Sequence, residues 1–406
     1  MLHGCEAPVG ARRPRPAVEL ADIVRGHGEA FRRAHALTPD QHAVLRAIER
    51  CRTAVLGGHL DVCLACGRTE PSYNSCRNRH CPKCQSLAQA RWIAGRLARI
   101  LPTHYFHVIF TLPAPLRPVL RRNPRRVFDL LFAAASETLL ELGRDPKWLG
   151  AELGITAVLH TWTRELTLHP HVHCIVTGGG LTADGTEWRS SKPDFLLPVP
   201  VMRALFRGKM CAKLRDAYDR GRLLLGPEPV DPEAMEILLD RLQRQDWVVY
   251  AKRPLGGAEH VVRYLGRYTH RIGISNQRLV SLQDGKVTFR TKNGKAITLD
   301  AQDFLARFLQ HVLPPGFVKI RHYGLMAPSH ATTKLVVARA LLNASRSDRP
   351  AQASPSVDAA LPWQELLRQL TGIDVRRCPA CGQLAIVRRP LDAPRVLARA
   401  PPQVAA

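Results

Sequence analysis

The hydrophobic positions of this chain follow two different periods, and each period predicts one kind of element. Apolar residues recur at helical spacing in several stretches: 18–52 (as two short helices), 85–101, 127–142, 202–224, 232–245 and 301–311. Patterns typical of strands occupy the remaining stretches: 105–112, 155–162, 171–177, 247–252, 279–282 and 286–299. A short polar connection predicts that 155–162 and 171–177 form an antiparallel hairpin, which we expect to leave through a flexible Gly178–Gly180 segment.

Turn and linker residues divide these elements. Thr38 and Pro39 predict the start of a helix, because a threonine side chain caps free amide groups and proline suits the first turn. Residues 1–16 are rich in proline, arginine and glycine, and predict a disordered basic tail. Serine, alanine and proline predict a linker over 345–362, and the tail from Pro390 is expected to be disordered.

Two histidines on one predicted strand are the first candidate site. In the run 168–180, His171 and His173 alternate with the apolar residues Val172 and Cys174. Residues two apart on a strand point to the same side, so both imidazoles face one way while the apolar side chains face the core. Two imidazoles side by side on a rigid strand provide two ligands of a divalent-metal site.

Such a site needs a third ligand, and three residues qualify. His160 is the first candidate, because on a hairpin it can sit across from His173 on the same face. Glu165 and His169 are the alternatives. We expect magnesium or manganese rather than zinc, since the metal has to coordinate phosphate oxygens in open positions.

Two tyrosines, about ninety residues further along, are candidate nucleophiles. Tyr264 and Tyr268 are four apart in a helical stretch at 259–270, which places both phenols on one helical face. A phenol that attacks phosphorus, with a metal that polarises the phosphate, allows DNA nicking through a phosphotyrosine. Tyr323 competes for this role, but it lacks a second phenol and is interpreted as structural or DNA-contacting. Three arginines beside the pair are expected to hold the phosphate: Arg263, Arg267 and Arg271.

The cysteines predict bound zinc. Cys63 and Cys66 form one C-x-x-C pair and Cys81 and Cys84 another, which is the spacing of a four-cysteine zinc site. Four further residues either hold a second ion or are ordinary core and solvent residues: Cys51, His59, Cys76 and His80. The stretch has few apolar residues, so we expect zinc to form its core.

Two further features are not part of this predicted set of zinc ligands. Cys378 and Cys381 form half of a zinc knuckle with no obvious partner in the sequence. Basic residues decorate the cysteine-rich stretch and predict contacts with DNA: Arg77, Arg79 and Lys83.

Composition narrows the partner and the compartment. Lysine and arginine number 59 against 34 aspartate and glutamate, a formal net charge of +25, which favours nucleic acid as the partner. Most of the 11 cysteines lie in or beside C-x-x-C pairs, which suits thiolate ligands in a reducing cytosol better than disulfides. The chain's start does not resemble a signal peptide, and no stretch approaches ~20 apolar residues. We therefore expect a cytoplasmic protein without membrane contacts, located at the nucleoid when it binds DNA.

Five blocks in order resemble one protein family. They are the cysteine-rich run 63–85, the runs 106–113 and 158–162, the histidine triplet with the tyrosine pair, and the run 320–324. The triplet followed by Tyr-x-x-x-Tyr resembles HUH endonucleases of the two-tyrosine class. The whole layout, over roughly 45–330, resembles the rolling-circle insertion-sequence transposases of the IS91 type, which carry a cysteine-rich zinc module ahead of the nuclease.

The resemblance implies a fold and a division into domains. The fold class is α+β, an antiparallel sheet with helices on its faces, preceded by a small zinc-binding module. The implied domains are a disordered basic tail (1–16), a helical and zinc-binding module (17–90), the HUH two-tyrosine catalytic domain (91–330), and a linker, C-x-x-C knuckle and disordered tail (331–406).

The resemblance also implies an activity, a transposase that nicks and joins single-stranded DNA at element ends. One tyrosine would form a 5′-phosphotyrosine and free a 3′-hydroxyl, and the second would perform the next cleavage. The sequence has no Gly-x-x-x-x-Gly-Lys-Ser/Thr run, so host replication and unwinding enzymes are the expected partners. The alternatives are a plasmid or phage replication initiator or relaxase, a non-catalytic zinc-module DNA-binding protein, and a three-carboxylate transposase. The last would leave the histidines and tyrosines without a role.

Overall fold

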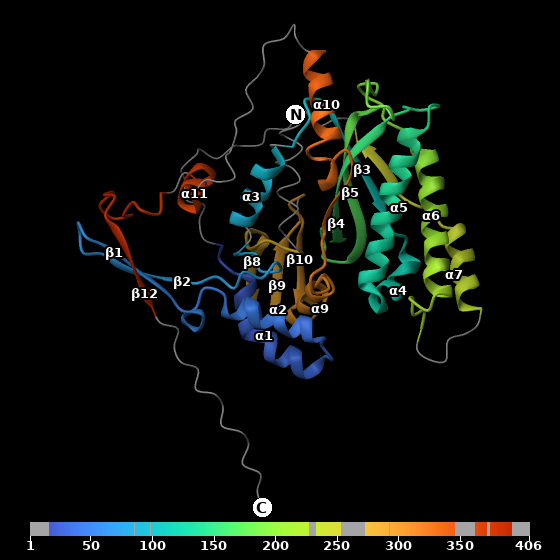
Figure 1. Cartoon of the computed structure of the whole chain (residues 1–406). Coiled ribbons are helices and arrows are strands. Elements are labelled where there is room, and N and C mark those ends of the chain that lie inside the picture. The colour runs from blue at the N-terminus through green and yellow to red at the C-terminus, as the bar shows by residue number, and fades with distance from the viewer. Residues whose placement is uncertain are drawn as a thin grey trace, which may run out of the picture. The chain divides into compact units, whose positions relative to one another are not determined.

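The computed structural model describes residues 16–84, 86–97, 99–226, 233–252, 273–291, 293–345, 362–371 and 374–391 (Figure 1). They divide into two compact units, which are considered separately below. Among described residues, the first unit comprises 16–84, 86–90, 274–291, 293–306, 362–371 and 374–391, and the second comprises 91–97, 99–226, 233–252, 273 and 307–345. Helices α3 (Ser86–Leu97) and α9 (Ala301–Leu309) each cross the boundary along the chain.

The second unit is built on a largely antiparallel sheet with the order β11-β4-β5-β3-β7, and β6 pairs with β5. Its strands are β3 (Tyr105–Thr111), β4 (Glu152–Trp162), β5 (Leu168–Leu181), β6 (Trp188–Ser190), β7 (Val249–Lys252) and β11 (Ile320–Gly324). The β4–β5 hairpin lies at its centre, as the sequence pattern predicted. A central hairpin with partners on both sides is a rigid support for side chains.

One face of this sheet is covered by helices (Figure 1). The main core packs alternate strand residues, such as Val172 and Cys174, against large side chains of the helices, such as Phe132 and Phe206. Between the strands of this sheet, the chain forms helices α4 (Arg117–Arg122), α5 (Pro124–Arg144), α6 (Val199–Asp219) and α7 (Ala234–Gln243). A 3-10 turn at Ala114–Leu116 precedes α4. Because strand side chains alternate, this core commits the intervening residues to the opposite face.

A smaller core lies on that opposite face. It joins Val158 of β4 and Ile175 of β5 to Leu335 and Leu342 of helix α10 (Lys334–Ala344), which follows a 3-10 turn at Pro328–His330. Helices therefore pack on both faces of the sheet, and the predicted α+β class is confirmed for the described residues.

Three successive glycines at 178–180 continue strand β5 and do not form the flexible exit that their composition predicted. A Cβ on Gly178 would lie 2.3 Å from the ring of His104, and one on Gly180 would lie 2.5 Å from the carbonyl oxygen of Glu152. Close approach of neighbouring groups, and not chain flexibility, therefore explains why glycine stands here.

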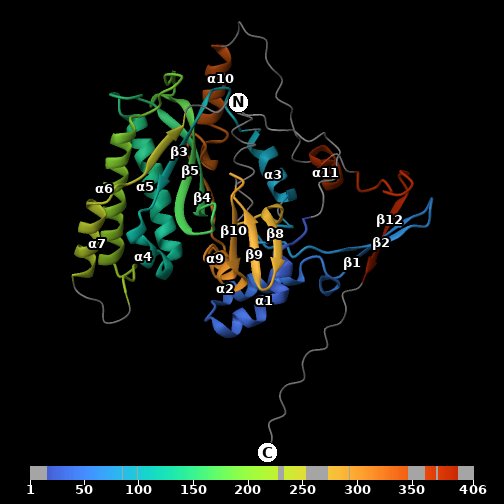
Figure 2. The same ribbon diagram turned by 180° about the vertical axis from the view of Figure 1, so that it is seen from behind.

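The first unit opens with helices α1 (Leu20–Ala34) and α2 (Pro39–Arg50), followed by a 3-10 turn at Ala54–Leu56. The Thr38 side chain accepts a hydrogen bond from the Gln41 amide and caps α2, as predicted. A second antiparallel sheet, with the order β10-β9-β8, belongs to the same unit (Figure 2). Its strands are β8 (Leu279–Gln283), β9 (Lys286–Arg290) and β10 (Ala296–Asp300), preceded by a 3-10 turn at Asn276–Arg278.

Residues that are far apart along the chain connect the segment of this second sheet to the N-terminal helices. The backbone amide of Leu20 donates to the side-chain oxygen of Asn276 over 3.1 Å, at the N-terminus of α1. Phe289 of β9 meets Phe304 of α9 edge to face at 5.8 Å. Residues 274–306 therefore group with the first unit, whereas the predicted 91–330 domain placed them with the nuclease.

A third sheet in the first unit has the order β12-β1-β2. Its strands are β1 (Gly58–Cys63), β2 (Thr69–Tyr73) and β12 (Ile386–Leu391), and helix α11 (Trp363–Thr371) precedes β12 along the chain. Strand β12 runs through Pro390, so the predicted disordered tail does not begin there. Among the residues that the structure describes, no helix has the length and apolar character needed to cross a bilayer.

Candidate functional site

His171 and His173 lie on β5, on the face of the sheet opposite to α5 and α6. Their neighbours Val172 and Cys174 are fully buried in the main core, which fixes the direction of both imidazoles. The ring centroids of the two histidines are 4.8 Å apart. The sequence prediction of two imidazoles on one side of a strand is thus confirmed.

His160 of β4 joins this pair from the neighbouring strand. Its ring centroid is 4.3 Å from that of His173 and 5.4 Å from that of His171. One ligand nitrogen from each of the three histidines lies within 4.8 Å of the others, so the three can surround one ion. The register pairs His160 with His171, whereas the prediction had placed it across from His173, which pairs instead with Val158.

His160, and not Glu165 or His169, completes the group with His171 and His173. Its ring stacks on Trp162 at 4.8 Å with an interplanar angle of 22°. Glu165 is exposed in the turn between the strands, and the His169 ring lies 5.2 Å from His171 but outside the group of three.

A fourth histidine, His107 of β3, orients the site and received no role from the sequence. Its Nε2 lies 2.7 Å from Nδ1 of His173. Nδ1 of His171 lies 2.6 Å from the carbonyl oxygen of His169, to which it can only donate. When His173 donates through Nδ1, as His171 does, Nε2 is the nitrogen that each strand histidine could offer to a metal. The only sequence signal for His107 was its polar position in a strand between Phe106 and Val108.

Burial keeps these imidazoles neutral. Desolvation lowers the pKa of His171 to about 4 and that of His107 to about 4, and it lowers the pKa of His173 well below its ordinary value. Neutral imidazoles at pH 7 are ready to bind a metal without first releasing a proton.

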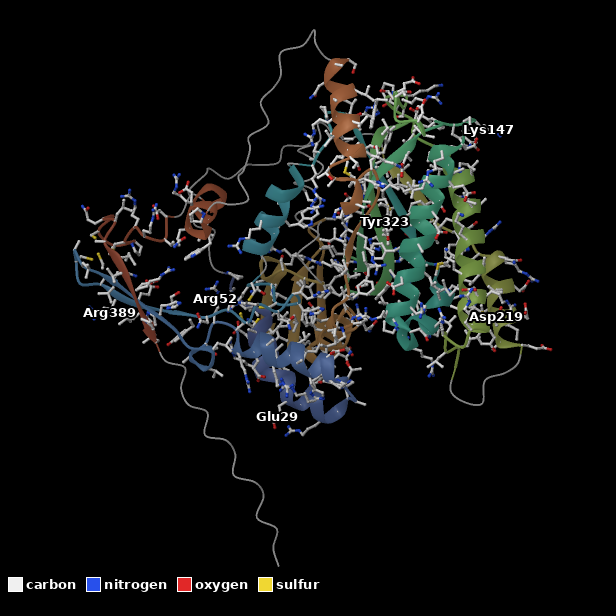
Figure 3. The ribbon with its side chains drawn as sticks, in the orientation of Figure 1. Glu29, Arg52, Lys147, Asp219, Tyr323 and Arg389 are labelled. Carbon is white, nitrogen blue, oxygen red and sulfur yellow. The ribbon has the colours of Figure 1, made fainter. Side chains whose placement is uncertain are left out.

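Two tyrosines of the described sheet differ in their relation to this site. Tyr323, labelled in Figure 3, packs against the main core. Its register partner Ile155 belongs to that core too, so its phenol is on the face away from the histidines. Tyr250 of β7 pairs with Ile109, which pairs with His173, and it is 51% exposed on the histidine face. Tyr250 had no sequence signal beyond its place in a predicted strand.

The predicted nucleophiles lie outside the described residues. Tyr264 and Tyr268 belong to the segment 253–272, and so do Arg263, Arg267 and Arg271. The described residues flanking this segment are Lys252, which pairs with His107 in the sheet, and Gly273, which lies near Leu166.

Four cysteines of the first unit gather around one point. Cys51 ends α2, Cys76 follows β2, and Cys81 and Cys84 precede α3. Their sulfurs lie within 4.8 Å of one another, with 3.2 Å between Cys51 and Cys84 and 3.6 Å between Cys76 and Cys84. The Cys76 side chain holds the pKa of Cys51 at about 7. Four sulfurs at this spacing fit a tetrahedral structural zinc.

This grouping differs from the one that the sequence predicted. Cys63 and Cys66 do not lie with Cys81 and Cys84, but with Cys378 and Cys381 in a second group. The reason is strand pairing, because β1 carries Cys63 to β12 and away from α3. Proximity along the chain was therefore a poor guide to which sulfurs meet.

The other predicted zinc residues take different roles. His59 is the second residue of β1, between Ser72 and Pro390 in the sheet, and it belongs to neither cysteine group. His80 is buried and its Nδ1 lies 3.1 Å from the side-chain oxygen of Asn78. Neither histidine replaces a sulfur, and the second group is completed by cysteines that were left without a partner.

The basic residues of this cysteine-rich stretch are not equivalent. Arg77 and Arg79 are exposed beside the first cysteine group. Lys83 forms an ion pair with Glu19. Arg77 is therefore better placed than Lys83 to contact phosphate.

Comparison with known proteins decides the family. A family model described as "Transposase zinc-binding domain", of the IS91 type, matches residues 23–112, and one described as "Putative transposase" matches residues 154–334. The protein named "Putative transposase y4qJ" of Sinorhizobium fredii (strain NBRC 101917 / NGR234) is 45% identical over 91% of this chain and 94% of its own length. The chain belongs to the IS91-type transposase family. Its N-terminal part accordingly contains a zinc-binding domain, to which the first cysteine group belongs.

A more distant relative supports the same assignment of this IS91-type transposase. The transposase for insertion sequence element IS801 of Pseudomonas savastanoi pv. phaseolicola is 28% identical over 82% of this chain and 79% of its own length. Among solved structures, a conjugative relaxase TrwC in complex with oriT DNA aligns over 40% of this chain and 68% of its own, with 14% identity and a TM-score of 0.23.

Proposed function

We propose that this transposase nicks and rejoins single-stranded DNA at the ends of its element through a tyrosine–DNA intermediate. The observation that carries the proposal is the group formed by His160, His171 and His173 on the face of the β4–β5 hairpin opposite to α5 and α6. Three imidazoles on one side would leave the remaining positions of an ion open to phosphate oxygens.

The three histidines would hold magnesium or manganese, which fits the chemistry better than a closed structural ion. When bound, the metal polarises the scissile phosphate and stabilises the negative charge that develops as the bond breaks. His107 and the carbonyl of His169 act through His173 and His171, since they set the orientation of the rings and do not reach the substrate.

Tyr264 or Tyr268 would supply the nucleophile. The phenolic oxygen attacks phosphorus, the bond from phosphorus to the 3′ oxygen breaks, and the phenolic proton is released. The products are a 5′-phosphotyrosine and a free 3′-hydroxyl that can prime replication. The second tyrosine then performs the next cleavage or the strand transfer without resetting the site.

Chain connectivity supports this assignment of the nucleophiles. Tyr264 follows Lys252, a neighbour of His107 in the sheet, by twelve residues. An extended chain of that length spans up to ~40 Å, so the phenols are within reach of the histidine face. Arg263, Arg267 and Arg271 are proposed to hold the phosphate beside them.

Net charge supports a nucleic acid as the substrate, for which we propose single-stranded DNA, with the nucleoid-containing cytoplasm as the place of action. The formal charge of +25 provides sequence-independent attraction to phosphate, to which Arg77 and Arg79 would contribute. Unwinding is assigned to host replication enzymes. The two curated relatives are both named transposases, which favours this role over that of a replication initiator.

The test is a covalent-adduct assay with the full chain. Labelled single-stranded DNA from the element ends is incubated with the protein and magnesium or manganese, and the products are separated under denaturing conditions. A labelled protein band that disappears when a chelator removes the metal is the expected result. DNA that is bound but never cleaved with either metal would instead identify a non-catalytic DNA-binding protein.

A further inference from the structure

The last C-x-x-C pair of the chain lies against the first one. The sulfurs of Cys63 and Cys381 are 3.6 Å apart, and those of Cys66 and Cys378 are 3.8 Å apart. All four sulfurs lie within 4.8 Å of one another. A tetrahedron with zinc–sulfur bonds of about 2.3 Å has edges of about 3.8 Å, whereas disulfide sulfurs are about 2.05 Å apart. The spacing is therefore that of four ligands around one ion.

The two pairs have the same backbone conformation. In the first, the amide of Gly67 donates to the carbonyl of Cys63 over 2.9 Å, and the amide of Cys63 donates to the carbonyl of Arg68 over 2.9 Å. In the second, Gly382 donates to Cys378 over 2.9 Å, and Cys378 donates to Gln383 over 2.8 Å. Both glycines have a φ of +74°, which favours glycine. Two matching knuckles facing each other form the usual frame of a four-cysteine zinc site.

Strand pairing brings the knuckles together. β12 pairs antiparallel with β1 over its whole length, from Cys63 opposite Ile386 to Gly58 opposite Leu391. The amide of Leu64 donates to the carbonyl of Ala385 over 2.9 Å, just beyond the strand ends. Arg388 of β12 forms an ion pair of 2.8 Å with Asp61 of β1. The C-terminal segment is thus the third strand of a sheet that starts near residue 58.

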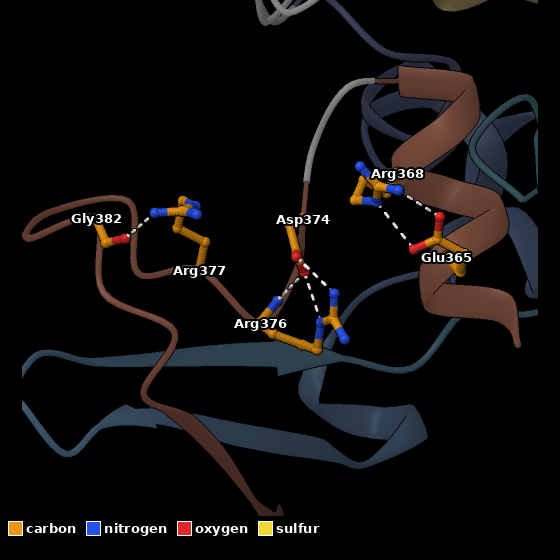
Figure 4. A network of polar contacts seen from close by, with 6 residues as sticks. All are labelled: Glu365, Arg368, Asp374, Arg376, Arg377 and Gly382. Atoms are coloured by element: carbon orange, nitrogen blue, oxygen red, sulfur yellow. Dashed lines mark hydrogen bonds and ion pairs between the residues drawn. The ribbon is translucent and has the colours of Figure 1, made fainter.

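The polar contacts drawn in Figure 4 are local to the C-terminal segment and, unlike the Arg388–Asp61 ion pair, do not reach β1. Arg376 forms an ion pair with Asp374 at 2.7 Å, and Arg377 donates to the carbonyl of Gly382 within the knuckle. In α11, Arg368 pairs with Glu365. These contacts shape the second knuckle, but they do not attach it to the first.

Little apolar surface is buried in this sheet. Leu64, Leu384 and Val387 are 68%, 60% and 40% exposed, while Cys63 and Cys378 are almost fully buried. A three-stranded sheet with so small a core is marginal by itself. A metal bound between the knuckles would replace the missing core and make the folding of this sheet depend on the ion.

We infer that Cys63, Cys66, Cys378 and Cys381 bind a second structural zinc ion, and that the segment 374–391 is an integral strand of the resulting zinc ribbon. Neither matched family range, 23–112 or 154–334, contains this segment. The ion would close a loop of more than 300 residues, because Cys63 and Cys381 are 318 positions apart. The inference does not depend on the proposed cleavage chemistry.

Zinc content of the full chain, purified reduced and without chelator, tests the inference. The parent protein should contain two zinc ions per chain. Cys378→Ser/Cys381→Ser should contain one, and Cys63→Ser/Cys66→Ser should also contain one. Cys211→Ala, which removes a buried cysteine outside both groups, should keep two.

Combining the changes identifies which sulfurs share an ion. The quadruple variant of these four cysteines should still contain one zinc, because both pairs bind the same ion. If Cys63 and Cys66 instead shared an ion with Cys81 and Cys84, Cys378→Ser/Cys381→Ser would lose no zinc. That result, or a parent protein with a single zinc that survives the quadruple change, would overturn the inference.

A measurement on the unaltered protein guards against variants that fail to fold. Hydrogen–deuterium exchange is followed in 58–73 and 374–391 before and after a chelator removes zinc. Exchange should rise in both ranges together, by about 10-fold or more, since one ion orders both strands. Loss of protection in 58–73 with none in 374–391 would contradict a shared ion.

Discussion

Nε2 of His107 lies 2.7 Å from Nδ1 of His173, and the two rings are stacked with an interplanar angle of 17°. A hydrogen bond donated by Nδ1 of His173 to Nε2 of His107 would hold the His173 ring in one orientation and leave its Nε2 unprotonated for a ligand. Within β5 itself, the carbonyl of His169 accepts a hydrogen bond from Nδ1 of His171 and orients that ring. Each strand histidine therefore has a partner that orients it, which is typical of metal-binding imidazoles.

His107→Ala should weaken the nuclease metal without abolishing cleavage. Loss of such an orienting partner typically reduces metal affinity or activity by about 10–100-fold. The measurement is the magnesium or manganese dependence of nicking, which should shift to higher metal and recover at saturation. His35→Ala, at an exposed histidine of the first unit, is the control. An unchanged metal dependence in His107→Ala would show that His107 only fills space.

Removing any metal-facing histidine should have a larger effect. His160→Ala, His171→Ala and His173→Ala should each reduce nicking by more than about 100-fold, because these side chains would bind the ion directly. Binding to single-stranded DNA should remain, since arginines and lysines supply it. Filter binding and nicking are measured on the same preparations. If the His171→Ala/His173→Ala double variant nicks as well as the parent, the metal site is elsewhere.

His311 provides a test of stability against pH. It is fully buried between Thr161 and the carbonyl of Leu166, and burial lowers its pKa from 6.5 to about 4. The unfolded chain then takes up a proton first as the pH falls. The contribution of neutral His311 to the free energy of unfolding is therefore complete above pH 6.5 and is lost toward pH 4. At pH 5 the loss should be about 2 kcal/mol.

His311→Gln separates this titration from its hydrogen bonds, because the amide can donate to Leu166 and accept from Thr161 without gaining charge. Denaturant unfolding at pH 7 and pH 5 should show a smaller loss of stability in the variant than in the parent. His35→Gln should behave as the parent. Equal pH dependence in all three proteins would mean that His311 is protonated in the folded state.

The buried glycines of β5 allow a test of packing. Gly178→Ala would place a Cβ 2.3 Å from the His104 ring, which is itself hydrogen-bonded to Ser191 at 3.0 Å. Overpacking of this kind costs about 1–3 kcal/mol, and the thermal unfolding midpoint should fall. Gly208→Ala on α6, where a Cβ meets nothing within 4 Å, should raise it instead. A midpoint that rises in both variants would show that the structure around 178–180 accommodates the added methyl group without overpacking.

Local patterns in the sequence were enough to predict the supports of the nuclease site. The alternation around His171 and His173 defines both the strand and its buried face, because period and burial are properties of neighbouring residues. The register of His160 was predicted incorrectly. An irregularity in β4 between His160 and Trp162 shifts the pairing there, and the sequence pattern does not encode such a shift.

Local sequence patterns could not predict the contacts between segments that are distant along the chain. Cys63 and Cys66 were matched with the next pair along the chain, yet their partners are Cys378 and Cys381, which β12 brings alongside β1. His107 was missed for the same reason, since its contact with His173 depends on the pairing of β3 with β5. Ligand types and spacing predict that a metal binds, whereas tertiary pairing decides which residues share it.

Tyr264 and Tyr268 are the proposed nucleophiles, and the double variant Tyr264→Phe/Tyr268→Phe tests this assignment most directly. Phenylalanine keeps the ring and removes only the attacking oxygen. Each single variant should block transposition, because a full cycle needs two cleavages. Adduct formation is measured separately, with labelled single-stranded element ends and magnesium. One of the single variants can still form an adduct at an isolated end.

The decisive measurement is covalent adduct formation by the double variant, with Tyr250→Phe as the matched control on the histidine face. The double variant should form no adduct while binding single-stranded DNA nearly as well as the parent, and Tyr250→Phe should form adduct normally. Adduct that persists in the double variant would contradict the two-tyrosine mechanism, and its loss in Tyr250→Phe would move the nucleophile to β7.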